Sequence, residues 1–316
     1  MTSSAGSNAG GAIMANDRSM LQGAEVWVPK GEVLVSSSGA YGPHGDFQEL
    51  SARLAFRRGE GLPGAVWSTE RALLWRDLGV HFVRAELARA AGIDTALGVP
   101  IHRGRELIAV VVLLLTLRCR SPGCVELWDE DPDLSVLRHA GGHYSGCTEF
   151  ESFSPLIQFP AGTGLPGRTW AAEAPVVLPD VRYANTFIRA GLAAKCGLQL
   201  GVGLPVYQRQ RVHQVVTLIA AEKQPFVQAV ELWDSSPSGL QLEVSERAPE
   251  LQEPVGGAPS GALAAAVREH GLPQILSGRA LGMKRDEHDR EAPLGIGLGL
   301  PIYGAEQLQK VLCLLF

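Results

Sequence analysis

The sequence has little of what marks nucleic-acid-binding, secreted or membrane proteins. Only five of its 316 residues are lysine, the formal net charge is −5 and no basic stripe is present, so we expect no nucleic-acid partner. Its five cysteines are an odd number without paired spacing, which argues against a disulfide framework and favours a reducing, cytoplasmic compartment. The longest apolar run, residues 107–117, is shorter than the ~20 residues of a membrane-spanning helix, and its β-branched residues predict a buried strand. We therefore expect a protein without a membrane segment.

The common catalytic and metal-binding motifs are missing too. H-E-x-x-H, C-x-x-C, G-x-S-x-G and Walker patterns do not occur. His139 and His143, followed by Cys147, come closest to a metal cluster, but no carboxylate stands at ligand spacing, so we expect no metal. Cys119 and Cys124 could form a local disulfide, but we interpret them as an inert pair in a linker. We expect no catalysis by this chain.

A glycine motif occurs twice, as GEGLPG and as GTGLPG, and matches the G-x-G-x-x-G of dinucleotide-binding loops. Such a loop presents free backbone N–H groups to a pyrophosphate and has an acidic residue about 20 positions further on. Here Pro63 and Pro166 each remove an N–H, and the aspartates further on, Asp77 and Asp180, follow the last glycine by 13 residues. We therefore interpret both motifs as tight turns that pack a helix onto a sheet.

The chain contains three repeats of about 100 residues. Three stretches open alike, as AEVW, VELW and VELW, and three end in a Gly-x-Pro strand followed by an apolar strand, with the Gly-x-Pro cores 105 and 96 residues apart. This period is that of a domain repeat. The third repeat is shorter and lacks the Gly-Leu-Pro-Gly turn, for which SGALAAAVREHG is the nearest counterpart. We divide the chain into a disordered tail (1–20) and repeats at 21–120, 121–225 and 226–316.

Each of the first two repeats shows the same order of predicted elements. Short strands come first, two helices with a small strand between them follow, and a hairpin of two long strands ends the repeat. Strands and helices that are separated in this way predict an α+β domain, with helices packed on a mostly antiparallel sheet.

Three features in this order resemble the GAF domain family: G-x-G-Leu-Pro-Gly-x-x-Trp, a helix that starts with Phe-[Val/Ile]-Arg-Ala, and a Gly-[Val/Leu]-Pro-[Ile/Val] strand. The resemblance covers the first two repeats and mainly the last two strands of the third. It implies a small-molecule-sensing or protein-binding regulatory module in signal transduction, which works with an effector protein or as a homo-oligomer. Kinases, phosphodiesterases, cyclases and transcription regulators are the family's usual effectors, and none of them is visible in the sequence.

The resemblance also implies a ligand cavity beside the loop that leads into the second helix of a repeat. We predict a cavity bordered by residues 180–196 and little or none in the third repeat. The alternative for Asp77 and Asp180 is helix capping, and for the arginines a solvated position on the outer helix face. The ligand-binding candidates are Asp180, Arg182, Phe187 and Arg189 in the second repeat and Asp77, Phe82 and Arg84 in the first.

Bilin-binding members of the family attach their chromophore to a cysteine about 17 residues before the proline of the Gly-x-Pro strand. The corresponding residues here are Val83, Ile188 and Lys284, so we expect no chromophore and no other cofactor. The Asn-Lys pair of cyclic-nucleotide-binding members is absent as well.

Two other functions stay open. One is a thiol-dependent redox enzyme related to free methionine sulfoxide reductase, although Pro63 and Pro166 stand where that enzyme has its cysteine. The other is a structural or dimerisation scaffold whose pockets have closed. In a scaffold of this kind, bulky side chains would fill the space between helices and sheet in every repeat.

The closing strands of the repeats predict how the repeats pack. Residues 107–115, 215–221 and 311–316 are apolar at both odd and even positions, so both faces of these strands should be buried. Helices of the same repeat cover only one face, and the linker between the first two repeats is too short for the connecting helix usual in tandem GAF domains. We expect the repeats to pack sheet to sheet, with the third docked on the second or on another copy of the chain.

Overall fold

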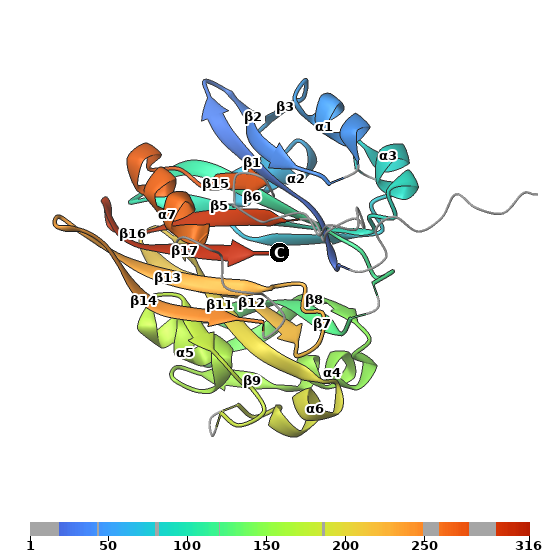
Figure 1. The fold of residues 1–316 in the computed structure, drawn as a ribbon, viewed down its shortest axis with the longest axis vertical. Coiled ribbons are helices and arrows are strands. Elements are labelled where there is room, and N and C mark those ends of the chain that lie inside the picture. Colours follow the sequence, from blue (N-terminus) through green and yellow to red (C-terminus); the bar gives the residue numbers. More distant parts are fainter. Residues whose placement is uncertain are drawn as a thin grey trace, which may run out of the picture.

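The computed structural model describes residues 19–42, 44–79, 82–119, 121–184, 187–248, 259–277 and 295–316, and these form three antiparallel sheets (Figure 1). Most of the predicted tail and Lys284 lie outside the described residues. Each sheet has helices packed on it, so the predicted α+β class with repeated GAF-like domains is confirmed. None of the helices in these ranges is long and apolar enough to cross a membrane.

The first sheet has the strand order β3-β2-β1-β6-β5-β4. Its long central strands are apolar because helix α2 covers one face and the other sheets cover the opposite face. The strands are β1 (Leu21–Lys30), β2 (Val33–Ala40), β3 (Ala55–Arg57), β4 (Leu73–Arg76), β5 (Thr95–Arg103) and β6 (Glu106–Leu115), and the helices are α1 (Gly45–Ser51), α2 (Gly61–Thr69) and α3 (Ala85–Ala90).

The second sheet repeats this arrangement in the order β10-β11-β12-β7-β8-β9. Helix α5 packs on it as α2 packs on the first sheet. The strands are β7 (Gly123–Asp131), β8 (Val136–Ser145), β9 (Gln158–Pro160), β10 (Val176–Leu178), β11 (Leu198–Gln208) and β12 (Arg211–Ala221), and the helices are α4 (Thr148–Phe153), α5 (Gly164–Ala172), α6 (Ala190–Lys195) and the 3₁₀ turn η1 (Ser154–Leu156).

The third sheet has one strand fewer, in the order β14-β13-β17-β16-β15. Its strands are β13 (Ala229–Ser236), β14 (Gly239–Arg247), β15 (Gln274–Ser277), β16 (Ile296–Gly304) and β17 (Gln307–Leu315), and its helix is α7 (Pro259–His270).

The two glycine motifs are the tight turns predicted from the sequence, and α2 and α5 begin inside them. A Cβ on Gly64 would lie 2.0 Å from the carbonyl oxygen of Arg57, and one on Gly167 would lie 2.1 Å from that of Pro160. Only glycine permits this contact between the helix and the preceding strand, so the glycines have a structural role.

Helix α7 takes the place of α2 in the third repeat, as predicted for SGALAAAVREHG. A Cβ on Gly98 of β5 would meet the side chain of Leu62 in α2, and a Cβ on Gly299 of β16 would meet that of Leu263 in α7. The same close packing of helix on strand is therefore present in both repeats, although α7 lacks the glycine turn.

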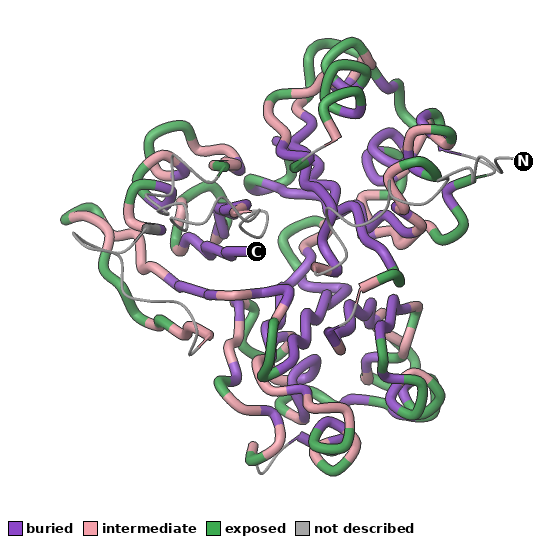
Figure 2. Tube along the Cα trace, turned by 45° about the vertical axis from the view of Figure 1, so that its right-hand side comes forward, coloured by how far each residue is buried: buried purple, intermediate pink, exposed green. Residues whose placement is uncertain are grey.

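The inner faces of the three sheets meet in one apolar core (Figure 2). On the inner face Val111 and Leu113 are 2 % and 4 % exposed, Leu115 and Leu312 are fully buried, and Leu314 is 1 % exposed. On the opposite face Val110, Leu114 and Val311 are fully buried, and Val112 and Cys313 are 1 % exposed. The prediction that both faces of the closing strands are buried is confirmed.

The docking of the third sheet differs from the sequence prediction. Strands β15 and β16 lie against β1, β2 and β5 of the first sheet, while β5 also lies against β11 of the second. The rings of Phe226, from the segment before β13, and Phe316 stack at 6.4 Å. The apolar faces of the three sheets pack together in one core. The third sheet therefore contacts the first sheet, whereas the sequence predicted docking on the second sheet or on another copy of the chain.

Candidate functional site

A buried ion pair lies between the helices and the sheet of the first repeat. It joins Glu25 of β1 to Arg84, which precedes α3, and both side chains have no exposed area. Arg84 Nη2 donates to Glu25 Oε2 at 3.1 Å, and Trp27 Nε1 donates to the same oxygen at 2.8 Å. Ser51 accepts a hydrogen bond from Arg84 and lies within 3.4 Å of Glu25 Oε1. The carboxylate and the guanidinium are therefore paired within the chain.

The second repeat has the same pair, formed by Glu126 of β7 and Arg189 before α6. Both side chains are fully buried, and two hydrogen bonds of 2.5 and 2.8 Å join them. The hydroxyls of Ser154, Tyr144 and Thr217 donate to the carboxylate at 2.8, 2.9 and 3.1 Å. Burial alone would raise the pKa of Glu126, but the charge of Arg189 and these hydrogen bonds outweigh burial and lower the pKa to about 2. Glu126 is therefore ionised at neutral pH.

Phenylalanine rings enclose both guanidinium groups. In both repeats one ring comes from the helix that follows the first hairpin, α1 or α4, and one from the segment that leads into α3 or α6. These cation–π contacts fill the interior where the family resemblance places a ligand. The distances to the ring centroids are 4.4 Å to Phe47 and 4.7 Å to Phe82 for Arg84, and 4.1 Å to Phe150 and 5.6 Å to Phe187 for Arg189.

The remaining predicted site residues lie outside these clusters. Asp180 pairs with Arg182 at 2.6 Å, and Arg182 also reaches Glu222 at 2.8 Å. The hydrogen bonds from the Arg182 side chain hold the pKa of Asp180 below its usual value. Asp77 is an exposed turn residue with a positive φ of 54°. Neither aspartate caps a helix, because the residues at the N-caps of α3 and α6 are Arg84 and Arg189.

The structure thus places Phe82 next to Arg84 and Phe187 next to Arg189. Both arginines pair with a glutamate of their own repeat. Ligand binding by the seven candidates stays a prediction. The sequence reasoning missed Glu25 and Glu126, the acceptors of both ion pairs. Their signal was an acidic residue at the same position of three otherwise apolar opening strands.

The third repeat has a different cation beside its own opening glutamate. Glu231 of β13 pairs with Arg247 of β14 at 2.6 Å, and Arg247 stands at the register position that Tyr144 has in β8. Within the described residues, Glu231 Oε2 and the indole N–H of Trp233 have no hydrogen-bond partner. The third repeat therefore keeps the buried glutamate but pairs it with an arginine of the neighbouring strand, whereas the other two repeats use an arginine that precedes a helix.

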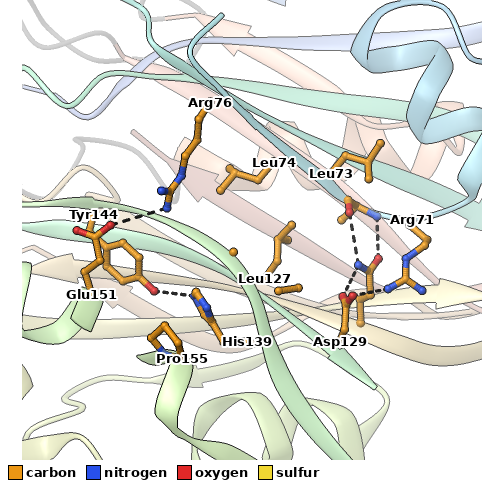
Figure 3. Close-up of a pocket in the computed structure, with 14 residues that line it drawn as sticks. Arg71, Leu73, Leu74, Arg76, Leu127, Asp129, His139, Tyr144, Glu151 and Pro155 are labelled. Carbon is orange, nitrogen blue, oxygen red and sulfur yellow. Dashed lines mark hydrogen bonds and ion pairs between the residues drawn. The ribbon is translucent and has the colours of Figure 1, made fainter. Parts of the chain in front are cut away.

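A cleft of about 570 Å³ lies between the first and second repeats, beside β4, β7 and β8 (Figure 3). At one end Arg71 pairs with Asp129 at 2.5 Å, and Gln214 accepts from the backbone N–H of Ala72 at 2.8 Å and donates to Asp129 at 2.6 Å. None of the described residues of 180–196 lines this cleft, and Phe187 and Arg189 pack into the interior of their own repeat instead.

His139 connects the cleft to the buried ion pair of the second repeat. Its Nε2 lies 2.8 Å from Tyr144 Oη, and Tyr144 donates its proton to Glu126. Since the tyrosine proton is used in this way, His139 must donate from Nε2, which leaves Nδ1 as an acceptor. Burial lowers the pKa of His139, so the ring is neutral at neutral pH.

Three of the five cysteines, Cys124, Cys147 and Cys313, do not resemble activated thiols. Burial raises the pKa of Cys147 to about 12, and it also raises the pKa of Cys124 and of Cys313. Such thiols are protonated at neutral pH and react slowly. In the part of the chain that the structure describes, no group of three or more His, Cys, Asp or Glu residues could hold a metal ion.

Residues 11–142 match the family model of the GAF domain, a range that includes the first repeat and the start of the second. The resemblance predicted from the sequence motifs is therefore confirmed. No curated protein sequence matches this chain.

Several solved structures are similar to about a third of the chain. One is free methionine-R-sulfoxide reductase from Neisseria meningitidis in complex with its substrate, with 21 % identity, a TM-score of 0.24, and 30 % of this chain and 50 % of that chain covered. Another is the A. aeolicus NLH2 GAF domain in an inactive state, with 21 % identity, a TM-score of 0.26, and coverages of 30 % and 58 %. A third is NreA from Staphylococcus aureus, mutated in its nitrate-binding site, with 18 % identity, a TM-score of 0.28, and coverages of 34 % and 79 %. The match spans less than two thirds of the length of the first two.

Proposed function

With the GAF match over residues 11–142 as the premise, we propose that this chain is a non-catalytic regulatory module that acts in signal transduction by binding a protein partner. The observation that carries the proposal is that Arg84 and Arg189, with their phenylalanine rings, fill the interiors of the first two repeats. A small molecule is then not the ligand of those interiors, and recognition takes place on the outer surface.

Opening either interior would be costly. A ligand would have to move a guanidinium away from a carboxylate that is itself fully buried. Leaving one member of a buried ion pair without its partner costs about 3–5 kcal/mol. Only a ligand that restores both the charge and the hydrogen bonds could offset this cost, so these interiors act as structural cores.

The outer surface of the first two repeats has apolar residues at corresponding positions. Phe153 in α4 and Ile188 before α6 are 41 % and 54 % exposed. Leu50 in α1 and Val83 before α3 hold the same places in the first repeat and are 36 % and 55 % exposed. Aromatic and aliphatic side chains of this kind are what protein interfaces bury at their centre. They support a protein partner over a soluble metabolite.

Native mass spectrometry and site-specific crosslinking test the proposal together. Freshly purified chain should show the polypeptide mass without a bound small molecule. A benzophenone amino acid at Phe153 should crosslink a defined cellular protein, whereas the same group at Leu134, in the β7–β8 turn, should not. A small molecule that co-purifies with the wild-type chain and is lost on Arg189→Met would contradict the proposal.

A second candidate function is small-molecule binding in the cleft between the first and second repeats. The hydrogen bonds from His139 through Tyr144 to Glu126 favour it, because they connect a cleft-lining side chain to the interior. If a small molecule does co-purify, Gly141→Leu should displace it from the cleft, and Gly191→Leu, at an exposed helix position, should not.

The redox alternative has its own test. Wild-type chain and a variant with Cys119, Cys124 and Cys196 replaced by serine should show the same background rate of free methionine sulfoxide reduction with dithiothreitol. A rate that depends on these cysteines would replace the proposal with an enzymatic function.

A further inference from the structure

Two helix ends in the second repeat bring two cysteines together. Cys147 is the N-cap residue of α4, and Cys196 is the C-cap residue of α6. The two helices pack side by side at one end of the second repeat (Figure 1). The two cysteines are far apart in the sequence, so only the fold makes them neighbours.

The thiols of Cys147 and Cys196 are in direct contact. Burial, and next the thiol of Cys196 through its charge and a side-chain hydrogen bond, raise the pKa of Cys147 to about 12. Cys147 belongs to the apolar cluster around Phe150 and Leu198, and Cys196 packs against the same cluster. Cys147 is buried, whereas Cys196 is only half-buried. One thiol of the pair is therefore accessible to small reagents, and the other lies behind it.

The other three cysteines are placed differently. Cys119 Sγ donates to Ser145 Oγ at 2.9 Å. Cys124 is fully buried in β7, and Cys313 belongs to the third repeat. Cys147 and Cys196 are thus the pair that the fold prepares for a bond between two sulfurs.

The first repeat shows that packing does not require cysteine at these two places. The N-cap residue of α1 is His44, and the C-cap residue of α3 is Ala91. A free cysteine can serve merely as a small apolar residue, but alanine already has that role at the end of α3. The contact between two thiols is a difference between two repeats that otherwise match.

We propose that Cys147 and Cys196 are a redox-responsive pair, which forms a disulfide when hydrogen peroxide reaches the chain and returns to two thiols in the presence of glutathione. This goes beyond the proposed function, since the bond forms without a protein partner. In the reducing compartment that the cysteine content leads us to expect, the pair consists of thiols until an oxidant arrives. An S–S bond is about 2.05 Å long, so the two sulfurs approach each other from their hydrogen-bonded contact.

The reaction has two steps. The sulfur of Cys196, which is the more accessible, attacks one oxygen of hydrogen peroxide; an S–O bond forms, the O–O bond breaks, and water leaves with the thiol proton. The sulfur of Cys147 then attacks the sulfur of Cys196; the S–S bond forms, the S–O bond breaks, and the hydroxyl leaves as water with the proton of Cys147. The cysteines lose two electrons and the peroxide gains them.

The disulfide would connect two parts of one outer surface. Helix α4 carries Phe153, and Ile188 precedes α6; both side chains are exposed and belong to the surface on which a protein partner is proposed to bind. Oxidation would fix the two helices to each other beneath that surface. The bond would also restrict the unfolded chain, which stabilises the folded one.

Disulfide mapping of the full chain tests the proposal. Trypsin cuts this sequence so that each cysteine falls in a different peptide. The folded chain is treated with peroxide, the remaining thiols are alkylated in urea, and the digest is analysed without reduction. Mass spectrometry should show the Cys147 peptide joined to the Cys196 peptide, and glutathione should remove the linked species.

Variants assign the bond to the two cysteines. Cys196→Ala, which places at the end of α6 the residue found at the end of α3, and Cys147→Ser, a preferred N-cap residue, should each abolish the linked peptide. Cys119→Ala is the control and should retain it. Circular dichroism checks that the variants fold. Iodoacetamide applied to the folded chain before peroxide should block the bond, because it reaches Cys196.

Thermal unfolding provides a second readout. The oxidised wild-type chain should unfold about 5 °C or more above the reduced chain, and peroxide should not change the unfolding temperature of Cys196→Ala. Absence of the linked peptide, a bond to Cys119 or Cys124 in the folded chain, or a lower unfolding temperature after oxidation would overturn the proposal.

The benzophenone crosslink at Phe153 separates this proposal from the proposed function. A crosslinked cellular protein without the linked peptide would overturn the redox pair and leave the protein-binding function intact. The linked peptide without a crosslinked protein would support the redox pair and count against the protein-binding function.

Discussion

Replacing Arg189 by methionine tests whether the buried ion pair is the structural core of the second repeat. Methionine keeps much of the side-chain volume between the phenylalanine rings but removes the positive charge. Glu126 then stays buried with hydroxyl donors only. We expect the free energy of unfolding to fall by about 3–5 kcal/mol, which is typical when one member of a buried pair is removed.

The loss should depend on pH, because the charge of Arg189 and the hydrogen bonds lower the pKa of Glu126 from 4.5 to about 2 in the folded chain. Because the folded-state pKa is depressed, this stabilisation is complete above pH 4.5 and is lost as the pH falls towards 2. The stability difference between wild type and Arg189→Met should therefore shrink between pH 5 and pH 3.

Urea unfolding followed by tryptophan fluorescence measures both effects. Arg182→Met is the matched control, since Arg182 pairs with Asp180 and Glu222 near the surface and its loss should cost less than about 1 kcal/mol. The double variant Glu126→Leu with Arg189→Met should recover part of the lost stability, because no charge is left unpaired. Equal losses for Arg189→Met and Arg182→Met, or a difference that does not change with pH, would refute the reasoning.

Three other predictions concern the contacts between repeats and the thiols. Gln214→Ala should lower the free energy of unfolding by about 1–3 kcal/mol in urea titrations, because the buried N–H of Ala72 loses its acceptor; a neutral effect would show that water replaces it. Leu314→Ala in the shared core should cost about 2–5 kcal/mol, whereas Leu134→Ala should change stability by less than about 0.5 kcal/mol. Iodoacetamide at pH 8 should leave Cys147 unmodified in the folded chain and modify it in urea, as read by peptide mass spectrometry; modification without urea would contradict its burial and raised pKa.

Local patterns in the sequence predicted the element types, the glycine turns and the burial of the closing strands. Strands such as β6 are apolar at both odd and even positions. This lack of alternation shows that both faces are covered, and it can be recognised without knowing which element covers them. The Gly-Leu-Pro-Gly turn was equally readable, because proline and glycine restrict the backbone at their own positions.

The ion pairs depended on tertiary structure. Glu25 and Arg84 are 59 residues apart, and Glu126 and Arg189 are 63 apart, so no helical or strand period connects them. The family resemblance suggested that Arg84 and Arg189 face a ligand. Their actual partner is a glutamate of the first long strand, which the sheet places opposite the helix start. Each arginine thus has a counter-ion within the chain, and ligand binding by Arg84 and Arg189 stays a prediction.

The arrangement of the repeats also required the structure. Apolar strands show that a face is covered, but they carry no information about which sheet covers it, because burial of apolar surface is not directional. The third sheet therefore contacts the first through β15 and β16, which its sequence did not indicate. Among the described strands β14 lies at the edge of its sheet, and this strand order is set by long-range pairing that no local pattern encodes.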